Sequence, residues 1–326
     1  MKSDIRKQRF IKKVLGIFAC IVLLSGCATE KTDILCVGAM KGPTSIGILP
    51  MMQEDVDGNY EFHMATAADE LVPMMAKGEL DVALVPANVA AILFQKTQGA
   101  VKVIDINTLG VLYFVSGNDK IQSIEDLRDT TIYMTGKGTT PEATVRYVLH
   151  AAGLKEEDYT LEFKSEPTEV AAILAQDFNA VALLPQPFVT VALSKNENLK
   201  IRMDLNELWQ TVSPEHQSMV TGVTVVRAEV LEKHPKAVER FLADHETSVT
   251  NLVNDLEKNA MYAVEAGILP NQELAMKAIP LCNIVCITGK EMQEALSGYL
   301  EVLAEFDAQL VGGALPRDEF YYTEIK

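Results

Sequence analysis

The chain has 326 residues, of which 48% are hydrophobic and 23% charged, and its formal net charge is −16. A strongly acidic surface repels phosphate backbones, so these numbers exclude a general nucleic-acid binder. The length also exceeds what one hydrophobic core commonly holds, and we therefore expect two lobes.

The first 26 residues have the pattern of a targeting signal. Six Lys and Arg residues precede the apolar run Val14–Leu24, whose 11 residues match a signal-peptide core and are too few to span a bilayer comfortably. The run ends in Leu24-Ser25-Gly26-Cys27, which resembles the bacterial lipobox, the motif whose cysteine is lipidated and becomes the new N-terminus. An ordinary secretory signal and an uncleaved anchor helix are the alternatives. We expect an extracytoplasmic protein that is lipid-anchored to the bacterial cell membrane at Cys27, with residues 27–32 as a tether.

Three further cysteines follow Cys27, namely Cys36, Cys282 and Cys286. The sequence has no C-x-x-C pair, and none of its five histidines has another at the spacing of metal ligands. We therefore expect no metal site and no cofactor. Cys282 and Cys286 either form a disulfide in an oxidising envelope or stay buried as free thiols, and we favour the thiols.

Strand-like apolar runs alternate with amphipathic stretches through the first two thirds of the mature chain. The first series of strands is expected at Asp33–Gly38, Tyr60–Ala65, Asp81–Pro86 and Val101–Asn107. The second series is expected at Thr131–Thr135, Thr160–Ser165, Ala180–Pro185 and Lys200–Asp204. Helices are expected at Asn88–Thr97, Glu142–Ala152, Thr168–Gln176 and Phe188–Lys195. This alternation predicts an α/β fold in which each lobe is a mainly parallel sheet flanked by helices.

The last third of the chain is predominantly helical. Helices are expected there at Ala237–Lys258, Gln272–Ala278 and Lys290–Phe306. We assign residues 33–109 and 223–326 to the first lobe and residues 110–222 to the second, so that the chain crosses between the lobes twice. The candidate hinge residues at these crossings are Leu109, Gly110, Thr221 and Gly222.

Two pairs of short matches indicate that the lobes repeat one structure. Lys41-Gly42-Pro43-Thr44 resembles Lys137-Gly138-Thr139-Thr140, 96 residues later. Val82–Pro86 (VALVP) resembles Val181–Pro185 (VALLP), 99 residues later. The nearly equal offsets predict two similarly wound lobes. Because ligands of open α/β sheets bind beyond the carboxyl ends of the strands, the loops after these strands would face each other across a cleft.

Loop residues of both lobes would line this cleft. Glycines there let a ligand approach the backbone, while hydroxyl, amide and N–H groups supply hydrogen bonds. The alternative is that Thr44, Ser45 and Thr139–Glu142 merely start helices, since they resemble helix caps. Lys41 and Lys137 favour an anion and Glu142 opposes one, so the charge of the ligand stays open. The candidate ligand-binding residues are Lys41, Gly42, Pro43, Thr44, Ser45, Pro86, Ala87, Asn88, Asn107, Thr108, Gly138, Thr139, Thr140, Pro185, Gln186 and Phe188.

No combination of residues in the sequence matches a known catalytic motif. There is no Gly-x-Ser-x-Gly nucleophile elbow and no Walker-type phosphate loop. Gly136-Lys137-Gly138 begins like a dinucleotide-binding loop, but Pro141 stands where the third glycine belongs. We therefore expect a binding protein without catalytic residues, and not an enzyme.

Several short stretches occur in an order that is typical of one family. They are Gly42–Thr44, Gly78–Ala83, Ser123–Arg128, Thr131–Tyr133, Leu184–Phe188, His234-Pro235 and Phe241-Leu242. With these stretches the chain resembles the substrate-binding proteins of ABC importers, and most closely the group that binds nitrate, sulfonates, taurine, bicarbonate and thiamine precursors. The resemblance implies a type 2 periplasmic-binding-protein fold that closes on a small-molecule ligand by hinge motion. It also implies a permease and a cytoplasmic ATPase as partners, and we expect a monomer.

Two other functions stay open beside transport. Some relatives of this fold are enzymes of thiamine or desulfination chemistry, which need a reactive His or Cys in the cleft, and none falls in the expected loops. A sensor that presents its ligand to a receptor kinase is the second alternative. The cysteine-rich loop that marks the pyrimidine-precursor binders is absent from this sequence.

Overall fold

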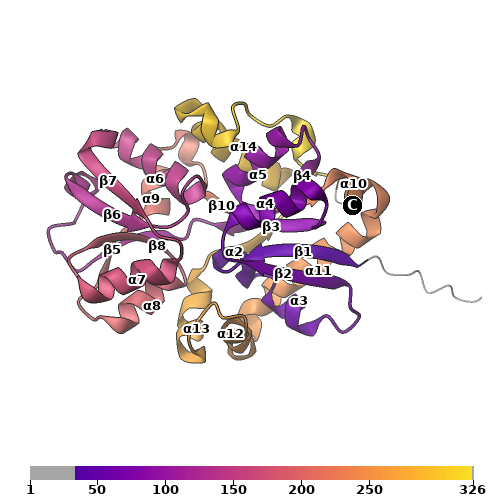
Figure 1. The fold of residues 1–326 in the computed structure, drawn as a ribbon, viewed down its shortest axis with the longest axis horizontal. Coiled ribbons are helices and arrows are strands. Elements are labelled where there is room, and N and C mark those ends of the chain that lie inside the picture. The colour runs from indigo at the N-terminus through magenta and orange to yellow at the C-terminus, as the bar shows by residue number, and fades with distance from the viewer. Residues whose placement is uncertain (1–33, 325–326) are drawn as a thin grey trace, which may run out of the picture. The chain divides into compact units, whose positions relative to one another are not determined.

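The computed structural model describes residues 34–324, so the targeting segment and Cys27 lie outside the described residues. Within this range the chain forms two β-sheets with helices around each (Figure 1). The α/β architecture expected from the sequence is therefore confirmed. Among residues 34–324, no helix combines the length and the apolar character that crossing a membrane requires.

The first sheet takes its six strands from both ends of the described chain. In spatial order they are β11 (Ile284–Ile287), β4 (Val101–Leu109), β10 (Val220–Arg227), β3 (Val82–Pro86), β1 (Leu35–Met40) and β2 (Tyr60–Ala65). β1 runs parallel to β2 and β3, whereas β10 runs antiparallel to both β3 and β4. β3 is buried along its whole length, which explains its continuous apolar sequence, since both faces of such a strand are covered.

The second sheet has five strands from the middle of the chain. In spatial order they are β7 (Tyr159–Phe163), β6 (Thr130–Met134), β8 (Val181–Pro185), β5 (Leu112–Ser116) and β9 (Lys200–Asp204). This order corresponds strand for strand to β2, β1, β3, β10 and β4 of the first sheet. The internal repeat seen in the sequence is therefore a repeat of topology.

Both sheets are mixed: four strands of each sheet run in one direction, in line with the predicted mainly parallel sheets, and the other strands run against them. β3 and β4 do run in the same direction, but β10 lies between them in the opposite direction. β5 takes the equivalent place between β8 and β9. The physical reason is the path of the chain. β4 continues into β5 without a crossover helix, and β10 returns from the second sheet, so each sheet receives one reversed strand from this exchange. The edge strand β11 is a second reversed strand in the first sheet.

Helices connect the strands that run in the same direction. Around the first sheet they are α2 (Pro43–Ile46), α3 (Leu49–Glu54), α4 (Ala68–Lys77) and α5 (Ala87–Lys96). Around the second they are α6 (Thr140–Ala151), α7 (Pro167–Gln176) and α8 (Phe188–Lys195). α9 (Leu205–Val212) follows β9 and leads back to β10 of the first sheet. Pro43 and Pro167 begin their helices, where a residue without an N–H leaves no donor unpaired. α4 ends at Gly78, whose φ of 76° is the left-handed conformation that glycine adopts readily.

After β10, β11 is the one named strand among the described residues, and the other named elements are helices. The α-helices are α10 (Ala228–Lys233), α11 (Pro235–Asn254), α12 (Leu256–Glu265), α13 (Gln272–Ala278) and α14 (Gly289–Phe306). The single helix expected over Ala237–Lys258 is two helices, because Asp255 leaves the helical conformation. The side-chain amide of Asn259 then donates to the carbonyl oxygens of Asn251 and Leu252, which closes the end of α11. The described 3₁₀ helices are η2 (Ile124–Leu127), η3 (Glu156–Asp158), η4 (Pro214–His216), η5 (Ile279–Leu281), η6 (Ala308–Val311) and η7 (Asp318–Phe320).

α14 packs against α5 from the first sheet and against α6 from the second. Trp209 is fully buried in this region, with its ring centroid 5.0 Å from that of Tyr147 and 4.9 Å from that of Tyr299. The Tyr299 hydroxyl lies 2.6 Å from Thr144 Oγ1. The tryptophan therefore serves packing, and these contacts tie the C-terminal helix to α6.

Candidate functional site

A cavity of about 440 Å³ lies where strands of both sheets end. Most of its lining comes from the ends of β1, β2 and β3 in the first sheet and of β6, β7 and β8 in the second, with the loops that follow them. Leu112 at the start of β5 and Thr221 of β10 complete it. Open α/β sheets bind their ligands at this edge. The volume falls within the range of about 300–1,000 Å³ that small-molecule sites commonly have.

Half of the candidate ligand-binding residues line this cavity, together with Thr221 from the hinge candidates. They are Lys41, Gly42, Pro43, Thr44, Pro86, Thr139, Pro185 and Phe188. Two matched loops of the repeat therefore meet at one cavity, as the sequence led us to expect. That these side chains bind a ligand stays a prediction.

Thr44 and Thr221 each bring a buried hydroxyl to the cavity wall. Thr44 is 4% exposed and Thr221 is 7% exposed, and neither Oγ1 has a hydrogen-bond partner among residues 34–324. The two side chains come from α2 and β10, and the Thr44 methyl group packs against Gly222. A buried hydroxyl without a partner costs about 1–3 kcal/mol. A polar group of a bound molecule would remove that cost.

Asn88, Gly138 and Thr140 are brought together by the structure, but their polar groups bond to each other and do not line the cavity. The Asn88 side-chain amide donates to the carbonyl oxygens of Gly138, at 3.2 Å, and of Leu310, at 3.3 Å. The Thr140 hydroxyl donates to Asn88 Oδ1 at 3.3 Å. These bonds join α5 to the loop before α6, and both Asn88 and Thr140 are fully buried.

The remaining candidates point into the protein interior. The Gln186 side-chain oxygen accepts a hydrogen bond from the Thr190 hydroxyl at 2.9 Å and so serves the start of α8. Asn107 donates its amide to the Thr224 hydroxyl at 3.2 Å, behind the cavity wall. The buried candidates outside the lining are Ser45, Ala87, Asn88, Asn107, Thr108, Thr140 and Gln186. Their loops were placed correctly, but the direction of each side chain depends on strand register, which the motifs did not specify.

Two loops of the cavity were missed by the sequence analysis. They follow β2 and β7 and contribute Thr66–Glu70 and residues 164, 165 and 167 to the lining. The starts of α4 and α7 are 99 residues apart, as are β3 and β8. Extending the repeat backwards by one strand would therefore have found both loops.

A glutamate of the same helix occupies the backbone N–H groups at each of three helix starts beside the cavity. The donor and acceptor residues, with N···O distances, are Thr66 and Glu70 (2.8 Å), Gly138 and Glu142 (2.7 Å), and Ser165 and Glu169 (2.9 Å). Free N–H groups at a helix start commonly bind anions. Here these particular groups are already bonded to carboxylates of the chain itself.

Three lysines balance these carboxylates at the cavity, namely Lys41, Lys137 and Lys164. Lys164 donates to Glu162 at 2.6 Å, and this hydrogen bond raises the pKa of the Lys164 amine. Asp69 and Glu70 line the same cavity. Both signs of charge are therefore present around the entrance.

The hinge candidates occupy two different settings. Gly110 lies between β4 and β5, and a Cβ atom at this position would come within 2.5 Å of the Asn206 side chain. Thr221 and Gly222 lie inside β10, where Gly222 pairs with Pro86 and Thr108. The predicted lobe boundary at residue 222 therefore falls within a strand of the first sheet. The hinge role of these residues, and that of Leu109, stays a prediction.

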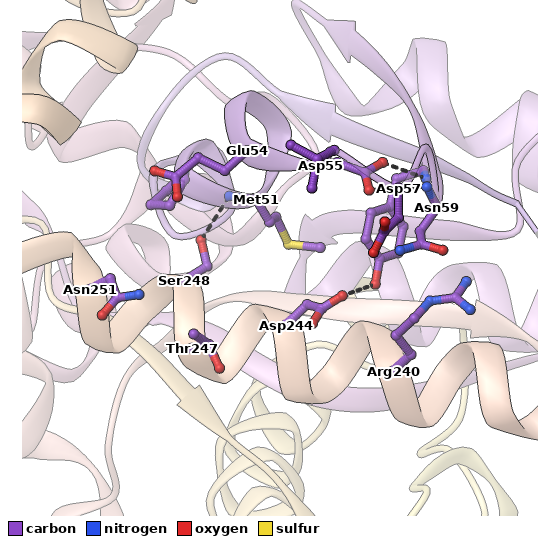
Figure 2. A pocket seen from close by; sticks show the side chains of 13 residues that line it. Met51, Glu54, Asp55, Asp57, Asn59, Arg240, Asp244, Thr247, Ser248 and Asn251 are labelled. Carbon is purple, nitrogen blue, oxygen red and sulfur yellow. Dashed lines mark hydrogen bonds between the residues drawn. The ribbon is translucent and has the colours of Figure 1, made fainter. Parts of the chain in front are cut away.

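A second and more open cavity of about 330 Å³ lies between α3 and α11 (Figure 2). Its lining comes from residues 50–60 and 240–251 alone. The Tyr60 hydroxyl donates to Asp244, and desolvation together with this contact raises the pKa of Tyr60. The Met51 N–H donates to the Ser248 hydroxyl. These groups bond to each other, whereas Asn59 Oδ1 of the same lining is buried without a partner among the described residues. Unlike the larger cavity, this one takes its lining from the first sheet's side alone.

Cys36, Cys282 and Cys286 are free thiols, so the two C-terminal cysteines form no disulfide. Burial raises the pKa of both the Cys282 and the Cys286 thiols. Cys286 lies beside His245 and Asp105, a grouping that sequence spacing did not reveal because the three positions are far apart in the chain.

The sequence model of one protein family matches residues 48–266 of this chain, and its description is the phosphonate periplasmic substrate-binding protein of an ABC transporter. No curated protein is similar enough in sequence to count as a relative.

Solved structures of transport proteins share the fold. One is an ABC transporter protein from Parabacteroides distasonis, 23% identical, with a TM-score of 0.74 over 90% of this chain and 100% of the other. The aliphatic sulphonate-binding protein SsuA from Escherichia coli is 14% identical, with a TM-score of 0.71 over 89% and 92%. The alkanesulfonate-binding protein SsuA from Xanthomonas axonopodis pv. citri, bound to MOPS, is 13% identical, with a TM-score of 0.66 over 88% and 96%.

Proposed function

The chain belongs to the family of phosphonate-type periplasmic substrate-binding proteins of ABC transporters, and we propose that it captures its ligand in the cavity lined by both sheets. The family predicted from the sequence is confirmed, and so is the role as the substrate-binding component of an ABC importer. The identity of the ligand and the residues that hold it are the proposal.

One observation carries the choice of cavity. Among residues 34–324, Thr44 and Thr221 are the residues whose buried hydroxyls lack a partner and also line this cavity. Thr44 follows the carboxyl end of β1, and Thr221 lies near the amino end of β10, which runs antiparallel to β3 and therefore begins at the same edge of the sheet. Ligands of open α/β sheets bind at this edge. We propose that this pair of hydroxyls binds the polar group of the ligand. Phe188 and Leu112 form the apolar wall on the side of the second sheet.

The ligand is a small organic molecule whose polar group is neutral or singly charged. The cavity volume of about 440 Å³ suits a small molecule, and apolar side chains line much of it. Glu70, Glu142 and Glu169 already bond the N–H groups that would otherwise attract a doubly charged oxyanion. Recognition therefore falls to hydroxyls and to lysines at the rim.

The partners and the location follow from the family and from the N-terminal sequence. We assign the chain an ABC permease and ATPase as partners, and a monomeric state outside the cytoplasm. The lipid anchor at Cys27 would keep the protein beside the permease, because only seven residues (28–34) separate that cysteine from β1.

Binding without catalysis is part of the same proposal. The lining of the cavity includes no histidine and no cysteine from the described residues. Enzymes of this fold need such a reactive group in the cleft to attack or deprotonate a substrate. A bound molecule recovered chemically unchanged after long incubation would support binding, and a recovered product would contradict it.

The test begins with native mass spectrometry of the full chain, to identify a co-purified ligand. A thermal-shift screen would then compare methanesulfonate, nitrate, methylphosphonate and uncharged heteroaromatic compounds. We expect stabilisation by a neutral or singly charged compound, and weaker stabilisation by methylphosphonate at a pH where it carries two charges. Thr221→Val should weaken the binding of the selected compound roughly 5- to 150-fold. Binding unchanged by this substitution would remove the proposed site.

A further inference from the structure

Three side chains from distant parts of the sequence meet at the first sheet, and none of them lines the cavity. Asp105 belongs to β4, His245 to α11 and Cys286 to β11. Asp105 Oδ2 lies 3.2 Å from His245 Nδ1, and Cys286 Sγ lies 3.8 Å from the same nitrogen. All three atoms lie within 4.8 Å of one another. An oxygen, a nitrogen and a sulfur ligand therefore converge on one point.

The spacing of these atoms is compatible with a tetrahedral ion as well as with hydrogen bonds. Ligand atoms bonded to one zinc ion at about 2.0–2.3 Å lie roughly 3.3–3.6 Å apart. The observed separations of 3.2 and 3.8 Å differ little from this. By contrast, one ring N–H points along a single line and can donate well to only one of two acceptors. A cation between the three atoms satisfies all of them.

The surroundings of Asp105 hold it in the orientation that a ligand needs. Asp105 and His245 are fully buried, and Asp105 Oδ1 accepts a hydrogen bond from the Thr224 hydroxyl at 2.8 Å. Asn107 donates to that hydroxyl in turn. Such outer hydrogen bonds fix metal-binding carboxylates. A divalent ion with one carboxylate, one thiolate and one neutral imidazole is electrically balanced, which lowers the cost of burying these charges.

We propose that Asp105, His245 and Cys286 bind one zinc ion, with an exchangeable water in the fourth position. Thiolate and imidazole ligands favour zinc over magnesium or calcium. β11 is the outermost strand of its sheet, and Cys286 is only half-buried, so an ion can reach the site from that edge. The zinc site shares no residues with the cavity lining, so this proposal can be tested independently of the proposed ligand site.

The experiment uses the purified full chain after removal of metal with a chelator. Titration with Zn²⁺ should show one tight site, and Co²⁺ in its place should produce a thiolate-to-cobalt absorption band. Both signals should be lost in Cys286→Ser and kept in Cys36→Ser. Cys36 is the matched control, because it is also half-buried in the first sheet and near carboxylates but has no histidine in its group. Zn²⁺ should raise Tm by on the order of 5 °C in the wild-type protein and in Cys36→Ser, but not in Cys286→Ser.

A second measurement needs no variant and so does not depend on the folding of one. Alkylation of the wild-type chain with iodoacetamide, mapped by mass spectrometry, should slow at Cys286 when Zn²⁺ is present and stay unchanged at Cys36. Equal protection of both thiols, or none at Cys286, would overturn the proposal. So would Zn²⁺ binding of equal affinity in the wild-type protein and in Cys286→Ser, because the ion would then be bound elsewhere.

Discussion

The loops after β1 and β6 begin with similar sequences but use their threonines differently. Thr44 of the first loop lines the cavity with a hydroxyl that has no partner among the described residues. Thr140 of the second is fully buried and donates to Asn88, while Thr139 donates to the carbonyl oxygen of Gly136 at 2.7 Å. The repeat therefore preserves the fold of the two loops but not their hydrogen bonding.

This difference suggests a division of work between the two sheets. The first sheet supplies the hydroxyls that are ready to bind, namely those of Thr44 and Thr221. The second sheet supplies a loop whose polar groups are internally satisfied, together with the apolar face of Phe188. We infer that ligand contacts made by the first sheet contribute specificity, while the second sheet mainly closes over the ligand. The following predictions test this inference.

The largest effect is expected from Gly222→Ala. An added Cβ would lie 2.5 Å from Asn107 Oδ1 and 2.6 Å from Thr44 Cγ2, so packed side chains would have to move. We expect a loss of about 1–3 kcal/mol in the free energy of unfolding. Because Thr44 would be displaced, ligand affinity should fall at least tenfold, as measured by calorimetry on the folded variant.

The control for this substitution lies in the second loop. Gly138 has a φ of 74°, so alanine is strained at this position, but the added Cβ would have no other atom within 4 Å. It should therefore cost about 1 kcal/mol of stability and leave ligand affinity nearly unchanged. A Gly222→Ala variant that binds as well as Gly138→Ala would show that the wall formed by Thr44 and Gly222 does not contact the ligand.

The next largest effect distinguishes the matched threonines directly. Thr44→Val keeps the shape and removes an unpartnered hydroxyl, so it should leave stability unchanged or slightly improved and weaken binding roughly 5- to 150-fold. Thr140→Val removes a hydrogen bond to Asn88 and should cost about 1 kcal/mol of stability, with little change in affinity. Chemical denaturation and ligand titration of both variants provide the measurement. Equal losses of affinity in Thr44→Val and Thr140→Val would show that the two threonines do not differ in ligand binding.

The sequence predicted most of the strands because their apolar runs are continuous and bounded by turns. Tyr60–Ala65 and Lys200–Asp204 have the expected bounds, and β3 and β8 begin one residue later than expected. β5, β10 and β11 were missed. Gly222 interrupts the apolar pattern of β10, and the chain crossing at β4 and β5 leaves no turn signal other than Gly110. Such reversed strands depend on how the two sheets exchange chain, which is not a local property.

The candidate site was predictable to about the level of the loop. Motifs place residues at the ends of strands, and half of those named do line the cavity. Whether a side chain such as Asn88 faces the cavity or the interior depends on the exact register and on distant partners such as Leu310. The grouping of Asp105, His245 and Cys286 depends even more on tertiary structure, because it joins β4, α11 and β11.

The smallest expected effect concerns the glutamates that occupy equivalent helix starts. Glu70 lines the cavity, whereas Glu169 bonds Ser165 without being part of the lining. Glutamine can keep the hydrogen bond while removing the charge. Glu70→Gln should therefore strengthen the binding of a singly charged anion about two- to fivefold, since a charge near a helix start is worth about 0.3–1 kcal/mol. Glu169→Gln should change the affinity for the same anion less than Glu70→Gln does.

The dependence on salt shows whether charge is the cause of this effect. At low ionic strength the gain from Glu70→Gln should be largest, and it should shrink as salt screens the cavity entrance. An uncharged ligand should bind Glu70→Gln and the wild-type protein equally. If Glu169→Gln had the larger effect, the charged groups of the second sheet would govern recognition, and the division of work inferred from Thr44 and Thr140 would be reversed. A gain that did not depend on salt would instead indicate that the substitution changes the loop itself, since the Thr66 N–H donates to Glu70 there.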